Sequence, residues 1–210
     1  MEKKLSIDHK DFKKNYNSKE PQLIILKFGS DFVDPVNSFI KISDDMDNSF
    51  LFESLKDGDL SGRYSVIGIK PDKILKITNK TSKIYADNNI EKVIDNNPIE
   101  AIRYFIDNSL IKKNDGIPSI ASGIFGYIGY DFVANIEDLP KEKIDEFGVP
   151  DSILLRPSIT VVFDKELKEI LICKAVWYTN NIDADNAYNF ALDEINKIKD
   201  KIKYDKIIKL

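Results

Sequence analysis

Residues 50–69 read FLFESLKDGDLSGRYSVIGI and contain two extended patterns joined by a polar link. The first pattern is the apolar run at residues 50–52, and the second is RYSVIG at residues 63–68. The link at residues 56–62 is rich in charged residues and glycine, as turns and loops usually are. Two strand-like runs around a turn-rich link predict a hairpin-like unit in an antiparallel sheet.

Such a hairpin places five polar residues at one end of the sheet: Glu53, Ser54, Arg63, Tyr64 and Ser65. They supply a carboxylate, hydroxyl groups and a guanidinium beside apolar strand residues. These groups suit a small zwitterion, because a carboxylate accepts hydrogen bonds from an ammonium group, and an arginine or backbone N–H groups bind a carboxylate. The alternative is an ordinary β-hairpin with a polar rim, and the spacing by itself favours that simpler interpretation.

Composition and charge exclude several classes of function. The 210 residues are 42% hydrophobic, which permits a real core, and a net charge of −4 disfavours a nucleic-acid binder. The single cysteine, Cys173, excludes an intramolecular disulfide, and with His9 as the single histidine a His/Cys metal site is not expected. The N-terminal residues lack a signal-peptide pattern, and no apolar run approaches membrane-spanning length. A soluble cytoplasmic protein without a nucleic-acid or membrane partner is expected.

Apolar periodicity and turn residues predict the other elements. A buried strand is expected at residues 22–28, and a helix begins at Pro35 with Val36, Phe39 and Ile40 on its apolar face. A turn is predicted at residues 70–72, and hairpins are predicted within residues 73–86 and 157–178. One further helix is expected to begin near Asn97, and another to span residues 183–202. Together they predict one α+β domain over residues 1–210, with antiparallel sheets packed face to face and helices outside.

Three glycines recur at regular spacing within residues 121–131: Gly123, Gly126 and Gly129. Their GxxGxxG spacing differs from the GxGxxG dinucleotide fingerprint, and the Gly-Lys-Ser/Thr of a P-loop is absent from the sequence. Glycine inside a strand permits close backbone approach, so a tightly packed central strand is expected. A direct ligand role for Tyr127 or Asp131 is the alternative.

Four groups of motifs resemble sequences of one enzyme family and occur in that family's order. LFES and GRYSVIG, at residues 51–54 and 62–68, resemble its LLES and RYSFIG. SGIFGYIGYD at residues 122–131 is similar to GGxxGYxGYD, and DPVNSFIKI at residues 34–42 is similar to TPVSAYLKL. VVFD at residues 161–164 resembles VVFDH, with Lys165 in place of the histidine. Over roughly residues 23–195 the chain therefore resembles the N-terminal domain of anthranilate synthase component I.

The resemblance implies two antiparallel sheets packed roughly orthogonally and completed by a C-terminal half. It also implies a lyase of tryptophan biosynthesis that converts chorismate and ammonia to anthranilate and pyruvate. Mg²⁺ and a glutamine amidotransferase subunit, which supplies the ammonia, are implied for the full-length enzyme. The family's metal-binding and acid/base residues lie in the C-terminal chorismate-binding domain, which this chain is expected to lack. No catalytic or metal-binding residue is assigned here, and the chain alone is expected to be inactive.

The resemblance also implies a regulatory role, since tryptophan inhibits the family by binding near LLES. Carried over by motif, the effector residues are Glu53, Ser54, Arg63, Tyr64 and Ser65. Three alternatives stay open. One is a fragment of aminodeoxychorismate synthase component I of the folate pathway, which shares the fold, although RYSVIG favours anthranilate synthase. The others are a free-standing amino-acid-binding module and a structural interaction domain that binds no small molecule.

Overall fold

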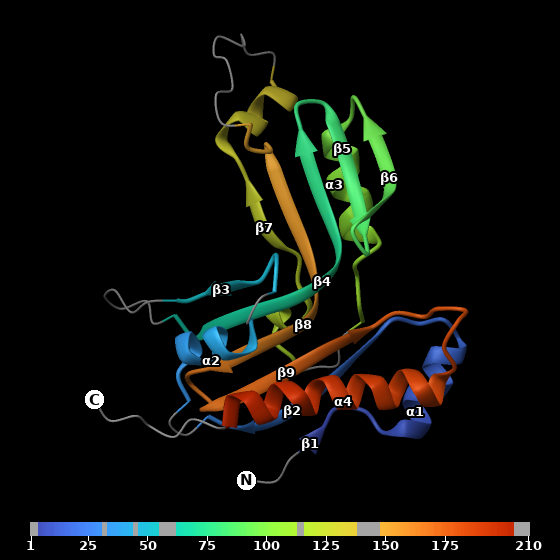
Figure 1. Cartoon of the computed structure of the whole chain (residues 1–210), viewed down its shortest axis with the longest axis vertical. Coiled ribbons are helices and arrows are strands. Elements are labelled where there is room, and N and C mark those ends of the chain that lie inside the picture. The colour runs from blue at the N-terminus through green and yellow to red at the C-terminus, as the bar shows by residue number, and fades with distance from the viewer. Residues whose placement is uncertain are drawn as a thin grey trace. The chain divides into compact units, whose positions relative to one another are not determined.

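The computed structural model describes residues 4–30, 33–43, 46–54, 62–112, 116–137 and 148–203. The chain divides into two compact units, and each unit collects segments that are far apart in the sequence. The first comprises Met1–Lys70, Ile111–Ser122 and Ser158–Leu210, and the second comprises Pro71–Leu110 and Gly123–Pro157. Two long strands, β4 (Tyr64–Thr78) and β8 (Ser152–Asp164), contribute to both units (Figure 1). The assignment of residues 1–210 to a single domain stays a prediction.

The first unit is built on antiparallel strands. Its strands are β1 (Lys4–Leu5), β2 (Gln22–Gly29), β3 (Phe50–Phe52), β9 (Glu169–Val176) and parts of β4 and β8. β1 pairs with β2, β2 with β9 and β9 with β8, while β3 pairs with β4, all antiparallel. Successive residues of a strand point to opposite faces of the sheet. Leu26 of β2 and its register partner Ile172 of β9 therefore share a face, and both belong to the main apolar core.

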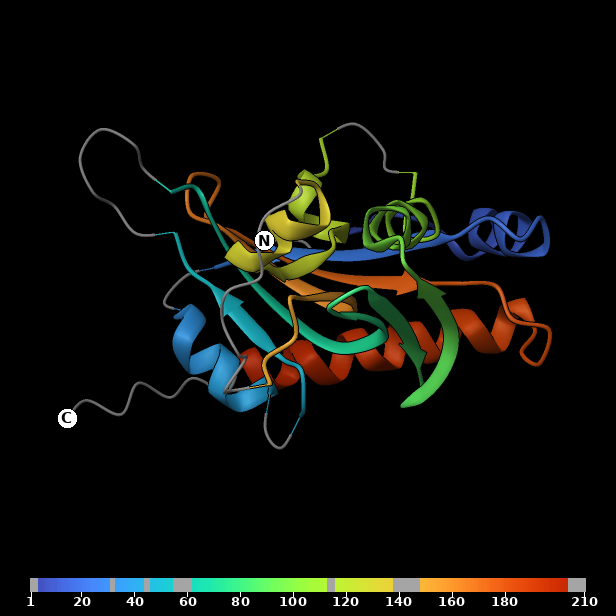
Figure 2. The same cartoon turned by 90° about the horizontal axis from the view of Figure 1, so that it is seen from above.

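Three α-helices of this unit are α1 (His9–Asn17), α2 (Pro35–Ile42) and α4 (Ala184–Lys203). The apolar stripe predicted for the last helix is confirmed: Ala184, Ala187, Tyr188, Ala191, Ile195, Ile198 and Ile202 are all buried. They join the core residues of β2 and β9, so α4 covers that face of the sheet (Figures 1 and 2). A 3₁₀ helix, η1 (Ser119–Ser122), packs against β9, and the Ala121 carbonyl accepts a hydrogen bond of 2.6 Å from Thr160 Oγ1.

The second unit packs one helix against its own antiparallel strands. It contains β5 (Thr81–Ala86), β6 (Asn89–Asp95), α3 (Pro98–Asp107), β7 (Phe125–Ile128) and the 3₁₀ helix η2 (Tyr130–Asn135). The predicted hairpin is confirmed, because Thr78 pairs with Thr81 around Asn79, whose φ of 55° suits a tight turn. The core of the unit consists of Leu75, Ile77, Ile84, Ala101, Phe105, Phe132 and Leu154.

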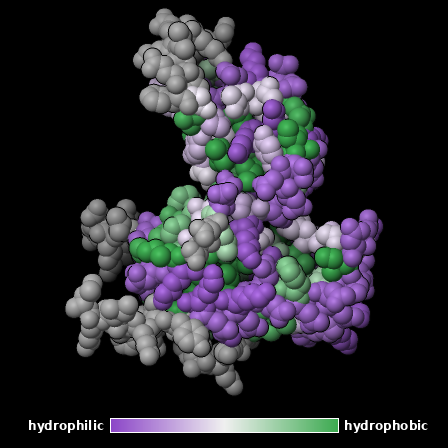
Figure 3. Space-filling view, viewed as in Figure 1, coloured by the Kyte–Doolittle hydropathy of each residue, from purple (hydrophilic) through white to green (hydrophobic). Residues whose placement is uncertain are grey.

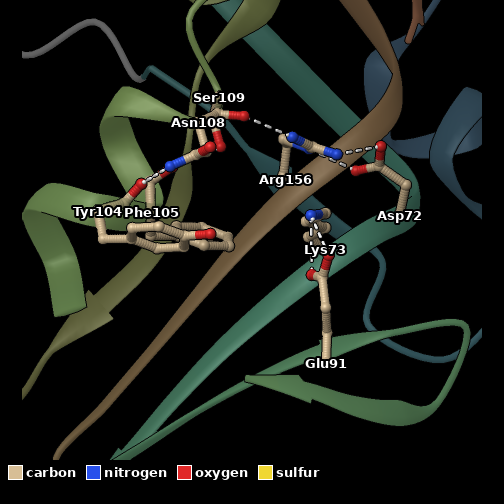
Figure 4. A network of polar contacts seen from close by, with 8 residues as sticks. All are labelled: Asp72, Lys73, Glu91, Tyr104, Phe105, Asn108, Ser109 and Arg156. Atoms are coloured by element: carbon tan, nitrogen blue, oxygen red, sulfur yellow. Dashed lines mark hydrogen bonds and ion pairs between the residues drawn. The ribbon is translucent and has the colours of Figure 1, made fainter. Parts of the chain in front are cut away.

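A polar network in the second unit joins α3 to two strands (Figure 4). Arg156 of β8 is 6% exposed, and its Nε and Nη2 donate to the two carboxylate oxygens of Asp72 at 2.7 and 2.6 Å. Its Nη1 donates to the carbonyl of Asn108, the C-cap of α3, at 2.8 Å. A cation is favourable at a helix C-terminus. The Arg156 guanidinium therefore stabilises the end of α3 and at the same time forms an ion pair with Asp72 of β4.

The predicted fold class is confirmed by the antiparallel strands and their packed helices, and the hairpin formed by β8 and β9 is confirmed by its register. The roughly orthogonal packing of two sheets depends on how parts of the chain are placed relative to one another. It therefore stays a prediction. The turn expected at residues 70–72 is wrong, because β4 runs through it. Lys70 adopts a left-handed φ of 49° inside the strand, so turn-forming residues here distort a strand without ending it.

Two predicted surfaces also differ from the structure. On α2, Val36 and Ile40 are exposed whereas Ile42 is fully buried, because the helix packs on α4 and β3 with its Ile42 side. β7 is not a central strand: it lies off the main strand order and pairs with β8. The close approach expected at its glycines is confirmed, since a Cβ on Gly126 would lie 1.9 Å from the Ile153 carbonyl oxygen.

The described surface seen in Figure 3 is mixed. Apolar residues form several small patches among polar residues in that view. In the described part of the chain, no helix is long and apolar enough to cross a membrane.

Candidate effector site

The site lies at one end of the hairpin formed by β3 and β4. Phe50 pairs with Gly68, and Phe52 pairs with Val66, so the two segments form the antiparallel hairpin that the sequence predicts. Gly68 is needed opposite Phe50, because a Cβ there would lie 2.2 Å from the phenylalanine ring. Gly68, the last residue of GRYSVIG, and Phe50, the residue just before LFES, are therefore one cross-strand pair, which fixes the register of the hairpin.

The two ends of the polar link meet at Ser54 and Gly62. A Cβ on Gly62 would lie 1.5 Å from Ser54 Oγ, so only a glycine fits beside this hydroxyl. Lys165 ties both segments to the turn between β8 and β9: its Nζ donates to the Ser54 carbonyl at 2.7 Å, and its backbone N–H donates to the Arg63 carbonyl at 3.0 Å. The prediction that these two segments meet at one end of the sheet is confirmed at Ser54, Gly62 and Arg63.

Arg63 forms a closed ion-pair cluster. Its Nε lies 3.1 Å from each carboxylate oxygen of Asp164, and its Nη2 lies 2.7 Å from one of them. Its Nη1 lies 3.2 Å from the carboxylate of Glu166, and its guanidinium carbon lies 4.9 Å from the centroid of the Tyr64 ring. All three guanidinium nitrogens therefore have acidic partners, although the side chain is 36% exposed.

Asp164 is the buried centre of this cluster, with its side chain only 1% exposed. Its Oδ1 also accepts the backbone N–H groups of Glu166 and Leu167 at 3.1 and 3.0 Å. Burial acts to raise the pKa of the carboxyl, but the hydrogen bonds from Arg63 and Leu167 outweigh burial, and the pKa lies below its ordinary value. Asp164 is thus a carboxylate at neutral pH, and it holds Arg63 in place.

The five predicted residues do not share one environment. Glu53 is exposed, and Ser54, Arg63 and Tyr64 are partly buried. Ser65 is fully buried, and by strand alternation it lies on the same face as the core residues of β4. Its Oγ is without a hydrogen-bond partner among the residues that the structure describes.

A cavity of about 290 Å³ lies beside Arg63 in the first unit. Its lining consists of Lys27, Arg63, Tyr64, Gly116, Ile117, Pro118, Asp164, Leu167, Glu169 and Leu171. Two of the predicted effector residues, Arg63 and Tyr64, belong to this lining. Sequence reasoning missed Lys27 and Glu169, whose only signal was their polar character within apolar strands.

Metal ligands were not expected in this chain. Within the described ranges, no three His, Cys, Asp or Glu residues are grouped so that they could hold a metal ion. Two carboxylates at this site, those of Asp164 and Glu166, pair with Arg63. The family resemblance implies Mg²⁺ only for the full-length enzyme, and we assign it no site among the described residues of this chain.

Curated proteins whose sequences are similar to this chain share one name. No family model matches the sequence. A curated protein named anthranilate synthase component 1, from Cereibacter sphaeroides, is 30% identical over 188 residues, covering 88% of this chain and 38% of the relative. A protein of the same name from Acetivibrio thermocellus is 26% identical over 179 residues, covering 85% of this chain and 36% of the relative.

A solved structure of anthranilate synthase component I from Streptococcus pneumoniae TIGR4 is similar with a TM-score of 0.49 and 17% identity. It covers 83% of this chain and 36% of that chain. This chain thus spans little more than a third of the length of these proteins. Over most of its own length the chain is homologous to part of anthranilate synthase component I, and the family resemblance of its motifs is confirmed.

Proposed function

We propose that this chain is the tryptophan-sensing part of an anthranilate synthase component I. The observation that carries the proposal is the pairing of β3 with β4, which brings Ser54 against Gly62 and Arg63. Ser54 and Arg63 are two of the five residues that the family resemblance connects with the effector. The names of the curated relatives support the same family, and the alignment with the Cereibacter sphaeroides relative covers 88% of this chain.

The proposed reaction converts chorismate and ammonia to anthranilate and pyruvate in the cytoplasm. A glutamine amidotransferase subunit would supply the ammonia, and a magnesium ion would assist the chemistry in the catalytic part of the enzyme. No residue of this chain receives a catalytic role in the proposal. The chain contributes regulation, and by itself it is inactive.

The proposed effector contacts follow from which groups are available. Glu53 is exposed, and Ser54 Oγ lies at the mouth of the hairpin, so these two residues receive the ammonium group of L-tryptophan. The nitrogens of Arg63 are occupied by Asp164 and Glu166. The carboxylate of the ligand therefore meets backbone N–H groups or Lys165 Nζ, which already lies 2.7 Å from the Ser54 carbonyl.

Feedback inhibition then arises from differential binding. A ligand shifts an equilibrium only to the extent that it binds one state more tightly than another. Tryptophan held at Ser54 would favour an arrangement of the enzyme with poorer catalytic geometry. The indole ring would pack on apolar residues of the hairpin.

Isothermal titration of L-tryptophan into this chain tests the proposal. We expect saturable binding by the wild-type chain and an affinity at least about tenfold lower in Ser54→Ala, since one hydrogen bond to a charged group is lost. The matched control is Ser18→Ala, an exposed serine outside the hairpin that should retain wild-type affinity. Equal affinities of the wild-type chain and Ser54→Ala, or no saturable binding by the wild-type chain, would contradict the assignment.

A further inference from the structure

The cavity beside Arg63 has a different chemistry from the Ser54 end of the hairpin. It lies on the sheet face opposite α4, because Leu171 and Lys27 alternate with the strand residues that face that helix. We call it the sheet cavity and define it by the ten lining residues given above. Its volume of about 290 Å³ is at the small end of ligand sites, which suits a metabolite of amino-acid size.

Two oppositely charged side chains stand on neighbouring strands in this cavity. Lys27 of β2 pairs in register with Leu171 of β9, and Glu169 lies two residues before Leu171, at the start of β9. Diagonal neighbours of this kind are about 7–8 Å apart at Cα, so one small molecule can touch both. Glu169 has two register partners: Gly29 of β2, which has no side chain to fill the space beside the carboxylate, and Asp164 of β8, which is paired with Arg63.

Lys27 and Glu169 are available for a ligand. Neither side chain has a hydrogen bond or an ion pair with the parts of the chain that are described. Both side chains are partly buried, and both line the cavity. By contrast, the other two charged lining residues, Arg63 and Asp164, bind each other through three hydrogen bonds.

The charge balance of the lining selects for a neutral molecule. Its two cations and two carboxylates cancel formally, so neither a phosphate-like anion nor a metal cation gains a net attraction. The rest of the wall is largely apolar, with Ile117, Pro118, Leu167 and Leu171 beside the Tyr64 ring. A net-neutral molecule with two separate charges and an apolar group matches this wall.

We infer that the sheet cavity binds an apolar α-amino acid, whose carboxylate pairs with Lys27 and whose ammonium group pairs with Glu169. The amino-acid side chain then lies against Leu171 and Ile117. The sheet cavity shares Arg63 and Tyr64 with the five effector residues carried over by motif, but Glu53, Ser54 and Ser65 do not line it. It is therefore a different site from the one proposed at Glu53 and Ser54.

Calorimetric titration of the whole chain with L-leucine, L-phenylalanine and L-tryptophan tests the inference. We expect at least one of them to bind, and Lys27→Met and Glu169→Gln each to weaken that binding about tenfold or more. The analogue without its carboxylate and the analogue without its amino group should each bind about tenfold more weakly too. Ser18→Ala is the matched control with unchanged affinity.

Two further measurements separate binding from folding. Lys27→Arg keeps the charge and should restore most of the affinity, while circular dichroism and thermal unfolding check that each variant is folded. Backbone amide resonances of Gly116 and Leu171 should shift on titration. The inference is overturned if none of the three amino acids binds. It is also overturned if binding is lost in Ser54→Ala but kept in Lys27→Met and Glu169→Gln, an outcome that would leave the proposed function standing.

Discussion

The most specific structural prediction concerns Arg156→Met in the second unit. The buried guanidinium donates to both carboxylate oxygens of Asp72 and to the carbonyl that ends α3 at Asn108 (Figure 4). Methionine preserves the apolar stem of the side chain but none of these hydrogen bonds. The substitution therefore releases the C-terminal end of α3 and leaves Asp72 without its partner.

The size of the effect follows from these contacts. Hydrogen bonds that involve a charged group contribute about 1.5–3 kcal/mol each, and removing one partner of a buried ion pair costs about 3–5 kcal/mol. The Asp72 side chain is 29% exposed and can recruit water after the change. We therefore expect a loss of about 3 kcal/mol in the stability of the α3 region, at the lower end of the range for a fully buried pair.

Amide hydrogen exchange of α3 measures this loss locally. A loss of about 3 kcal/mol corresponds to roughly a hundredfold faster exchange of the protected amides of the helix. Arg103→Met is the matched control, because Arg103 is an exposed residue of the same helix. Surface substitutions usually change stability by no more than about 0.5 kcal/mol, so its exchange should stay near the wild-type rate.

Two results would refute this reasoning. One is exchange in Arg156→Met that is no faster than in Arg103→Met, since the network would then contribute nothing to α3. The other is full retention of protection in Arg156→Lys. A lysine is a single point charge and cannot form the two-pronged contact with Asp72, so an intermediate loss is expected.

Three further predictions concern the first unit. Because the pKa of Asp164 is lowered from 3.8, the stabilisation from its pairing with Arg63 is present above about pH 4 and is lost as the pH falls through the folded-state pKa. Arg63→Met should therefore lower stability to urea more at pH 7 than at pH 3, as followed by the fluorescence of the single tryptophan; an equal effect at both pH values would argue against the pairing. Gly62→Ala should displace Ser54, since the added Cβ would lie 1.5 Å from its Oγ, and should weaken L-tryptophan binding in titration as much as Ser54→Ala does; unchanged affinity would disprove this contact. Burial raises the pKa of the Cys173 thiol to about 12, so a disulfide reagent at pH 8 should modify it only in urea, and rapid modification of the folded chain would show that the thiol is accessible.

Local sequence patterns predicted those elements that are determined by residues close together in the sequence. The seven-residue apolar stripe of α4 and the Asn79 turn between β4 and β5 were both visible as patterns, because helical periodicity and turn geometry are local properties. The hairpin that carries Ser54 was also predicted, since its two strands are separated by a short polar link.

Contacts between distant segments were not predictable in the same way. Arg63 and Asp164 are 101 residues apart, and the sequence alone suggested that Arg63 was available for a ligand carboxylate. Lys27 and Glu169 come together only through the register of β2 and β9. Such a register depends on packing across the whole sheet, which no local pattern specifies.

The central claim is most directly tested by an enzyme assay on a chimaera in which this chain replaces the aligned segment of the Cereibacter sphaeroides relative. With chorismate, ammonia and magnesium, the account predicts that anthranilate forms and that L-tryptophan inhibits its formation. The Ser54→Ala chimaera should need at least about tenfold more tryptophan for the same inhibition, and the Ser18→Ala chimaera should behave as the parent. A folded chimaera whose anthranilate formation is not inhibited by L-tryptophan, or one whose inhibition is unchanged by Ser54→Ala, would contradict the account.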